Sequence, residues 1–163
     1  MARGLNCWRK RCYNLTMKYI ATIEIPRNSD RRIHKDYHEW KFIDFGLISE
    51  KITANGGRMP LAYGFINDTA SETVERDETD VMIFSTSDFE TGDSVEVVPF
   101  AMMVRADGDY KVLAHDNTIS YTSFDEIPAD MQKTLMDFNG FKLPIIEIKN
   151  AEDSIAYIES VKI

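Results

Sequence analysis

Short apolar runs separated by turn residues make up the first two thirds of this 163-residue chain. Glycine- and aspartate-rich stretches such as Asn55-Gly56-Gly57 and Asp107-Gly108-Asp109 come between the runs and favour tight turns, because these residues tolerate positive φ. Strands this short and this closely spaced are typical of a small sandwich or barrel. The pattern predicts strands at residues 18–25, 40–48, 61–66, 81–85, 95–105 and 112–114.

Two helices are predicted in the last third, with one more apolar strand at residues 145–148 between them. The first helix follows Ile127-Pro128 and stops at Asn139-Gly140, and Asn150 caps the second. The fold class is therefore mainly β (α+β), in a single domain over residues 17–163. The apolar positions that recur at helical spacing are Met131, Leu135, Met136 and Phe138 in the first helix, and Ile155, Ile158 and Val161 in the second.

The first sixteen residues differ from the rest of the chain, because they hold four basic residues, no acidic residue and both cysteines. We expect residues 1–16 to be a disordered basic extension, and Met17 to lead directly into the first strand. The same composition would suit an organelle transit peptide. A body without cysteine favours a reducing compartment, and we expect a cytoplasmic protein.

Charge narrows the possible partners. Without the four basic residues of the extension, 15 Lys and Arg remain against 27 Asp and Glu, which gives residues 17–163 a net charge of −12. A body this acidic repels nucleic acid phosphates. No apolar run approaches the roughly 20 residues of a membrane span. We therefore expect neither nucleic acid nor a membrane as a partner.

Three carboxylates stand directly before an apolar strand. Glu75, Asp77 and Asp80 precede the run Val81–Phe84, so a rigid strand would hold them together at its start. Mg²⁺ prefers oxygen ligands at near-octahedral geometry, which converging carboxylates supply. A charged turn on an acidic surface would have the same sequence. This segment is therefore either a hard-metal site or a plain turn.

Three other groups of polar residues can be interpreted as parts of a site or as plain surface residues. Asp107-Gly108-Asp109 is typical of a hairpin turn, but it could add a second pair of carboxylates to the first group. His34 and His38 lack a third soft ligand nearby and are interpreted as surface histidines. A basic cluster either meets a substrate phosphate or lies in a solvated loop; it consists of Arg27, Arg31, Arg32 and Lys35.

Several short motifs occur in a fixed order along the chain. They are I-E-I-P (23–26), Y-G-F-I-N-D-T (63–69), E-R-D-E-T-D-V (75–81), G-D-S-V-E-V-V-P-F (92–100) and D-G-D-Y-K-V-L-A (107–114). In this order the chain resembles the soluble family I inorganic pyrophosphatases, over residues 19–163. The family has D-x-D-P-x-D-V where this chain has Glu75, Asp77, Asp80 and Val81, so only the first carboxylate differs.

The resemblance implies a five-stranded barrel of the oligonucleotide-binding (OB) type with flanking helices. It also implies Mg²⁺, with Mn²⁺ as a possible substitute, pyrophosphate as the substrate, and a homo-oligomer. The implied metal ligands are Glu75, Asp80, Asp107 and Asp109, with Asp77 activating the attacking water. The implied phosphate-binding residues are Lys51, Tyr63, Lys111 and Lys142, with Glu24 at the outer edge of the acidic group.

The departures from the family concern the residues that would bind phosphate. A gap-free alignment from I-E-I-P puts a phosphate lysine and a glutamate of the family on Ile33 and Lys35. Met59 and Phe141 stand where the family has tyrosines. Two functions follow. The first is Mg²⁺-dependent hydrolysis of pyrophosphate, which the retained Asp77 favours. The alternative is a non-catalytic or substrate-shifted relative that binds a phosphorylated ligand or a protein partner.

Overall fold

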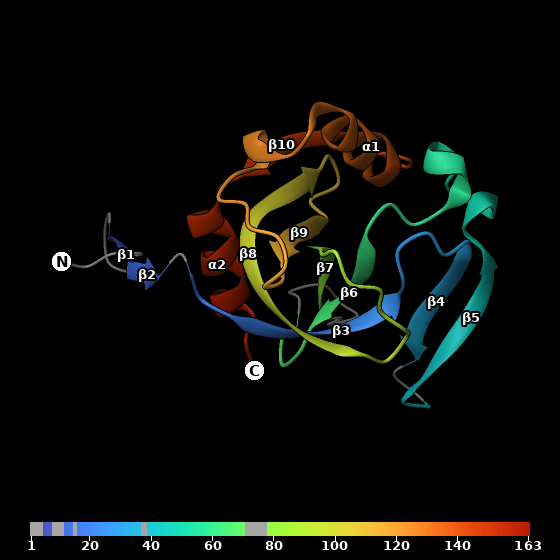
Figure 1. Ribbon diagram of the computed structural model, residues 1–163, viewed down its shortest axis with the longest axis horizontal. Helices are drawn as coiled ribbons and strands as arrows, with labels where there is room; N and C mark the ends of the chain where they lie inside the picture. The colour runs from blue at the N-terminus through green and yellow to red at the C-terminus, as the bar shows by residue number, and fades with distance from the viewer. Residues whose placement is uncertain (1–4, 8–11, 15, 37–38, 71–77) are drawn as a thin grey trace.

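A closed ring of strands forms the centre of the molecule (Figure 1). The computed structural model describes residues 5–7, 12–14, 16–36, 39–70 and 78–163. Within these residues one sheet has six strands in the order β10-β8-β3-β6-β7-β9, and β8 also pairs with β9, which closes five strands into a ring. The predicted five-stranded OB-type barrel is confirmed. Its strands are β3 (Tyr19–Ile25), β6 (Ala62–Ile66), β7 (Thr79–Phe84), β8 (Ser94–Arg105), β9 (Tyr110–His115) and the added β10 (Ile145–Lys149).

Both faces of β6 and nearly all of β7 are buried, so these central strands are almost continuous apolar runs rather than alternating ones. In β7, Met82 and Phe84 belong to one buried cluster, and Val81 and Ile83 belong to another. The first cluster includes side chains of α1 (Ala129–Asn139), and the second includes Ile158 of α2 (Ala151–Ser160). Each helix therefore completes a different cluster of the barrel.

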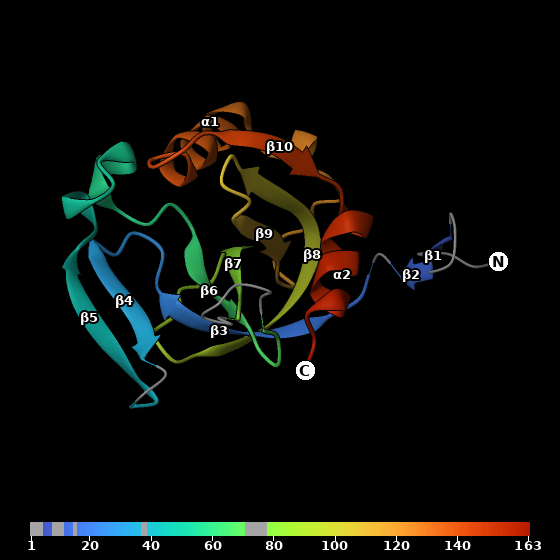
Figure 2. The ribbon, with the colours of Figure 1, turned by 180° about the vertical axis from the view of Figure 1, so that it is seen from behind.

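The helices begin where the sequence predicts. The Asn150 side chain accepts a hydrogen bond from the backbone N–H of Asp153 at 2.9 Å and caps α2. Helix α1 follows Pro128 and ends at Asn139. Figure 2 shows α1 and β10 together at one end of the barrel and α2 alongside β8. In the described part of the chain, no helix is long and apolar enough to cross a membrane.

A separate hairpin lies beside the barrel and was only half predicted. Its strands are β4 (Arg31–Asp36) and β5 (Lys41–Leu47), and the 3₁₀ turns η1 (Ile48–Glu50) and η2 (Ala54–Gly57) lead from it to β6. The sequence predicts β5 but assigns β4 to a polar loop. Pairing with β5, from Arg31 opposite Leu47 to Asp36 opposite Lys41, makes this polar segment a strand.

In the described part of the N-terminal extension, β1 (Leu5–Cys7) pairs antiparallel with β2 (Cys12–Asn14). Figure 1 shows the pair at the side of the barrel where α2 lies. The division into an extension and a domain over residues 17–163 stays a prediction.

Replacing Leu113 with alanine tests how far stability depends on the barrel core. Leu113 has no exposed surface and belongs to the cluster completed by α1. Leu113→Ala should lower the free energy of unfolding by about 2–5 kcal/mol, because the buried site collapses only partly. Ile146→Ala is the matched control, since this strand residue is 64% exposed; it should change stability by less than about 0.5 kcal/mol. Urea unfolding measures both, and equal losses would contradict this assignment of the core.

Candidate active site

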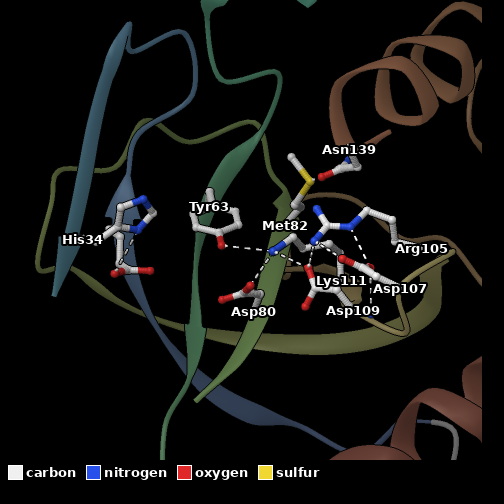
Figure 3. Close-up of polar contacts among 10 residues, drawn as sticks. His34, Tyr63, Asp80, Met82, Arg105, Asp107, Asp109, Lys111 and Asn139 are labelled. Atoms are coloured by element: carbon white, nitrogen blue, oxygen red, sulfur yellow. Dashed lines mark hydrogen bonds and ion pairs between the residues drawn. The ribbon is translucent and has the colours of Figure 1, made fainter. Parts of the chain in front are cut away.

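Neighbouring barrel strands place Asp80, Tyr63 and Lys111 on one face. Strands β7 and β9 are parallel with Val81 opposite Val112, so Asp80 and Lys111, one residue earlier on each strand, leave the same face. On β6, Phe65 is opposite Asp80, and Tyr63 lies two residues away on that face. This is the face covered by α1. Figure 3 shows the three side chains pointing toward one another.

Lys111 is the centre of this group (Figure 3). Its Nζ forms an ion pair with Asp80, lies 3.4 Å from Oδ2 of Asp109 and donates a hydrogen bond to the Tyr63 hydroxyl at 3.4 Å. Burial alone would lower the pKa of Lys111, but the negative charges of Asp80 and Asp109 raise it well above its ordinary value. Lys111 therefore stays positively charged although its side chain is only 18% exposed.

Tyr63 stays protonated in the same environment. Burial, reinforced by the charge of Asp80, raises the pKa of Tyr63 well above its ordinary value. A protonated phenol keeps its O–H as a hydrogen-bond donor. The site therefore offers two donors, the Tyr63 hydroxyl and the Lys111 ammonium.

The turn between β8 and β9 carries two more aspartates. Backbone hydrogen bonds from Arg105 N to Asp109 O and from Gly108 N to Arg105 O, both 2.9 Å, form the predicted hairpin turn, with Gly108 at φ +85°. Arg105 binds both carboxylate oxygens of Asp107, through Nε at 2.9 Å and Nη2 at 2.8 Å. These hydrogen bonds lower the pKa of Asp107 well below its ordinary value. Nη2 also lies 3.5 Å from Oδ2 of Asp109.

A buried carboxylate connects the hairpin to the barrel. Glu24, on β3, is 6% exposed and accepts a hydrogen bond from the backbone N–H of Lys35 at 2.7 Å. Its Oε2 also lies 3.6 Å from Nδ1 of His34. The imidazole of His34 in turn meets the Tyr63 ring edge-on, with the ring centroids 6.1 Å apart. Glu24 thereby positions β4 next to the group around Lys111.

A cavity of about 260 Å³ opens next to this group. One part of its wall is basic, although the chain carries a net charge of −8. The rest of the wall is largely apolar and includes Met59 and Phe141, where the resembling family has tyrosines. Such a cavity attracts a small anion to its basic side. The basic residues are Arg32, His34, Lys51, Arg105 and Lys111.

Most of the predicted site residues meet here, and some do not. Lys51, Tyr63, Asp109 and Lys111 line the cavity, and Asp80 contacts Lys111. Asp107 and Glu24 lie next to lining residues, whereas Lys142 is exposed and outside the lining. Glu75 and Asp77 lie outside the described residues. No cluster of three or more His, Cys, Asp or Glu that could hold a metal is found in the parts of the chain that the structure describes.

The sequence did not identify Arg105 or His34 as site residues, and it left Arg32 open. On β4, Arg32 and His34 face the cavity while Ile33 packs against the core. The gap-free alignment names Ile33 and Lys35, which lie on the face of this strand opposite Arg32 and His34. Alternation along β4 would have indicated Arg32 and His34 once residues 31–36 were identified as a strand. For Arg105, the sequence offered one indication of a site residue, namely a basic residue two positions before the Asp107-Gly108 turn.

Comparisons with known proteins agree on one family. A family model described as inorganic pyrophosphatase matches residues 21–144. The structure is similar to the inorganic pyrophosphatase of Ehrlichia chaffeensis, with 20% identity, coverage of 98% of both chains and a TM-score of 0.79. It is also similar to that of Thermus thermophilus, with 17% identity, 88% coverage of both chains and a TM-score of 0.76.

A third similar structure was solved with PPi bound. It is the N-terminally truncated vacuolar soluble pyrophosphatase of Trypanosoma cruzi, with 17% identity, coverage of 96% of this chain and 72% of that chain, and a TM-score of 0.69. At these identities the likenesses show the fold. No curated protein sequence matches the chain significantly.

The Asp107–Arg105 pair should make stability depend on pH in the acid range. Because the folded protein lowers the pKa of Asp107, the pair stabilises it above the unfolded pKa of about 3.9, and this contribution is lost as pH falls below that value. Asp107→Asn should therefore be less stable than the unmodified protein near neutral pH, with the difference shrinking below about pH 4. Urea unfolding across the pH range measures it. In an Arg105→Met background, Asp107→Asn should change stability much less at every pH. If it changes stability there as much as it does in the unmodified protein, the proposed pairing is wrong.

Proposed function

The chain belongs to the inorganic pyrophosphatase family, and from this premise we propose that it hydrolyses inorganic pyrophosphate to two phosphates with the help of a divalent metal ion. One observation supports this proposal most: Lys111 brings the carboxylates of Asp80 and Asp109 and the hydroxyl of Tyr63 together next to a basic cavity. Carboxylates and phosphate-binding donors in one place are what metal-assisted phosphoryl transfer requires.

The basic wall suits a polyanionic substrate. Lys51 and Lys111 line the cavity together with Arg32, His34 and Arg105. Charged donors such as these lysines and arginines bind phosphate oxygens more strongly than neutral donors do. We propose that Lys111 and Tyr63 donate to the phosphate on which charge builds during cleavage, and that Lys51 holds the other phosphate. Lys142 is exposed next to Phe141, which lines the cavity, and stays a proposed phosphate contact.

Asp80 and Asp109 fit a hard metal ion. Both carboxylates reach the same ammonium nitrogen, so their oxygens already converge on one centre of positive charge. Oxygen ligands of this kind suit Mg²⁺, and Mn²⁺ as a substitute. We propose that Glu75 joins Asp80 and Asp109 as a ligand. When bound, the metal supplies a Lewis acid and lowers the pKa of its water.

Asp77 is proposed to act on the attacking water. It belongs to the same acidic segment as Glu75 and Asp80, and we propose that it accepts the proton as the water attacks phosphorus. Glu24 is proposed to act indirectly, because it fixes β4 and the imidazole of His34 beside Tyr63. The residue that accepts the proton is then separate from the residues that donate hydrogen bonds to phosphate.

We further propose that the protein acts in the cytoplasm as a homo-oligomer. The cysteine-free body over residues 17–163 supports a reducing compartment, and the family resemblance supports the oligomer. Sedimentation of the purified protein together with fractionation of its cells would test both.

Phosphate release from pyrophosphate should require both the metal and Lys111. The protein should release phosphate with Mg²⁺ or Mn²⁺ and lose this activity on exhaustive chelation, because the carboxylates would otherwise repel the substrate. Lys111→Met should lower turnover by roughly 10² to 10³, the usual effect of removing one donor to developing charge. Lys133→Met is the control, since this exposed lysine of α1 pairs only with Asp137 in the described structure. Activity that survives chelation would exclude the metal mechanism, and no release from pyrophosphate, triphosphate or nucleotides would favour the binding alternative.

Asp77→Asn and Asp80→Asn should separate water activation from metal binding. Asp80→Asn removes a charged ligand, so metal affinity and turnover should both fall, and excess Mg²⁺ should restore part of the rate. Asp77→Asn keeps the size of the side chain but cannot accept a proton, so turnover should fall by roughly 10² to 10⁴ with metal affinity almost unchanged. Calorimetric Mg²⁺ titration and rates at low and high Mg²⁺ provide the comparison. If neither substitution alters hydrolysis, the acidic segment is only a charged turn.

A further inference from the structure

A positively charged side chain of the protein, Arg105, lies among the aspartates of the candidate site. We propose that the guanidinium of Arg105 takes the place of one divalent metal ion beside Asp107 and Asp109, so that Asp107 anchors Arg105 and is not a metal ligand. The family resemblance instead implies that Asp107 and Asp109 together take a metal that arrives with the substrate. The inference rests on the proposed function only for the substrate; the site itself is defined by contacts within the protein.

Arg105 uses both oxygens of Asp107. Nε donates to Oδ1 at 2.9 Å and Nη2 to Oδ2 at 2.8 Å, which is the bidentate geometry that a guanidinium makes with a carboxylate. Oδ1 also accepts a hydrogen bond from the backbone N–H of Asp109 at 3.2 Å. The ion pairs of Asp80 and Asp109 use one carboxylate oxygen each, whereas both oxygens of Asp107 are engaged, so a metal ion on Asp107 would have to break a bidentate pair. Asp107 is therefore a poor metal ligand in this chain.

The turn itself determines this pairing. Arg105 ends β8, and the backbone hydrogen bonds of the turn hold residues 105–109 in one tight hairpin. Within it, Arg105 lies two residues from Asp107 and four from Asp109, and its Nη2 contacts both carboxylates. The guanidinium carbon also lies 5.9 Å from the centroid of the Phe141 ring, which covers it from the segment after α1. With only 13% of its side chain exposed, Arg105 is held in place from two sides.

Arg105 also faces the cavity. It lines the cavity together with Lys111 and Asp109, and Figure 3 shows its side chain reaching across the two aspartates toward Lys111. Its Nη1 has no hydrogen-bond partner among the residues that the structure describes, because every contact found there uses Nε or Nη2. This nitrogen is available to donate to a phosphate oxygen. Arg105 can therefore contact the substrate while it neutralises Asp107.

The local charge balance supports the same assignment. Asp80, Asp107 and Asp109 carry three negative charges. Lys111 and Arg105 contribute two positive charges within ion-pair distance of them. With two of these three charges balanced inside the protein, fewer external cations are needed before a polyanion can approach, while the proposed site residues Glu75 and Asp77 still require a metal ion. The protein then performs with Arg105 the neutralisation that a metal ion would otherwise provide.

Counting bound metal ions tests this inference. Metal-free protein is titrated calorimetrically with Mn²⁺ in the presence of methylenediphosphonate, a diphosphate that is not hydrolysed. Arg105→Met frees both oxygens of Asp107, so the variant should bind one more Mn²⁺ than the unmodified protein. Arg58→Met is the control, because the Arg58 side chain donates only to the backbone oxygen of Asn28 in the described structure and lies outside the cavity lining; it should leave the number unchanged. Equal numbers for Arg105→Met and the unmodified protein would overturn the inference.

A second variant keeps the test decisive if Arg105→Met does not fold. Asp107→Asn in the unmodified background should leave the number of bound Mn²⁺ ions unchanged, because Asp107 is engaged by Arg105. Loss of one Mn²⁺ in this variant would show that Asp107 is a metal ligand and would overturn the inference. Both measurements are made without hydrolysis. If pyrophosphate is not cleaved but Arg105→Met gains a metal ion, the proposed function fails and the inference about Arg105 stands.

Discussion

Strand β9 pairs with both β7 and β8, and the whole candidate site depends on this double pairing. The parallel pairing with β7 places Asp80 beside Lys111, and the antiparallel pairing with β8 closes the ring and forms the turn that carries Asp107 and Asp109. Parallel neighbours need a crossover connection rather than a tight turn, and β8 is the segment that connects β7 to β9 here. The strands are buried on both faces, which gives the site a rigid base.

Charge is distributed unevenly over this protein. The chain is acidic overall, yet the cavity has basic residues from β4, β8, β9 and the segment after β5. Net charge governs solubility and long-range repulsion, whereas the local field governs which ligand a cavity accepts. A repelling surface around an attracting cavity favours small polyanions over nucleic acid, whose phosphates would also meet the acidic surface.

The phosphate side of the site differs from the pattern of the resembling family, but it does not lack positive charge. Two tyrosine positions of that family are occupied by Met59 and Phe141, and both side chains line the cavity. Phe141 also covers the guanidinium of Arg105, a contact that requires only the face of an aromatic ring and no hydroxyl. Arg32, His34 and Arg105 supply basic groups from elements on opposite sides of the cavity. Loss of a residue in a motif therefore does not by itself measure loss of a function.

The sequence by itself determined the barrel strands, both helices, the Asn150 cap and the family, because these depend on local periodicity and on the order of motifs. It also identified Tyr63, Asp80 and Lys111, which the structure brings together. Only the tertiary structure decided that residues 31–36 form a strand, since its polar residues are ordered by pairing with β5 and by Glu24 of β3. The contacts of Arg105 were decided in the same way. A pattern of residue types cannot show which carboxylate a guanidinium binds, because that choice depends on the turn geometry and on Phe141, which is distant in the sequence.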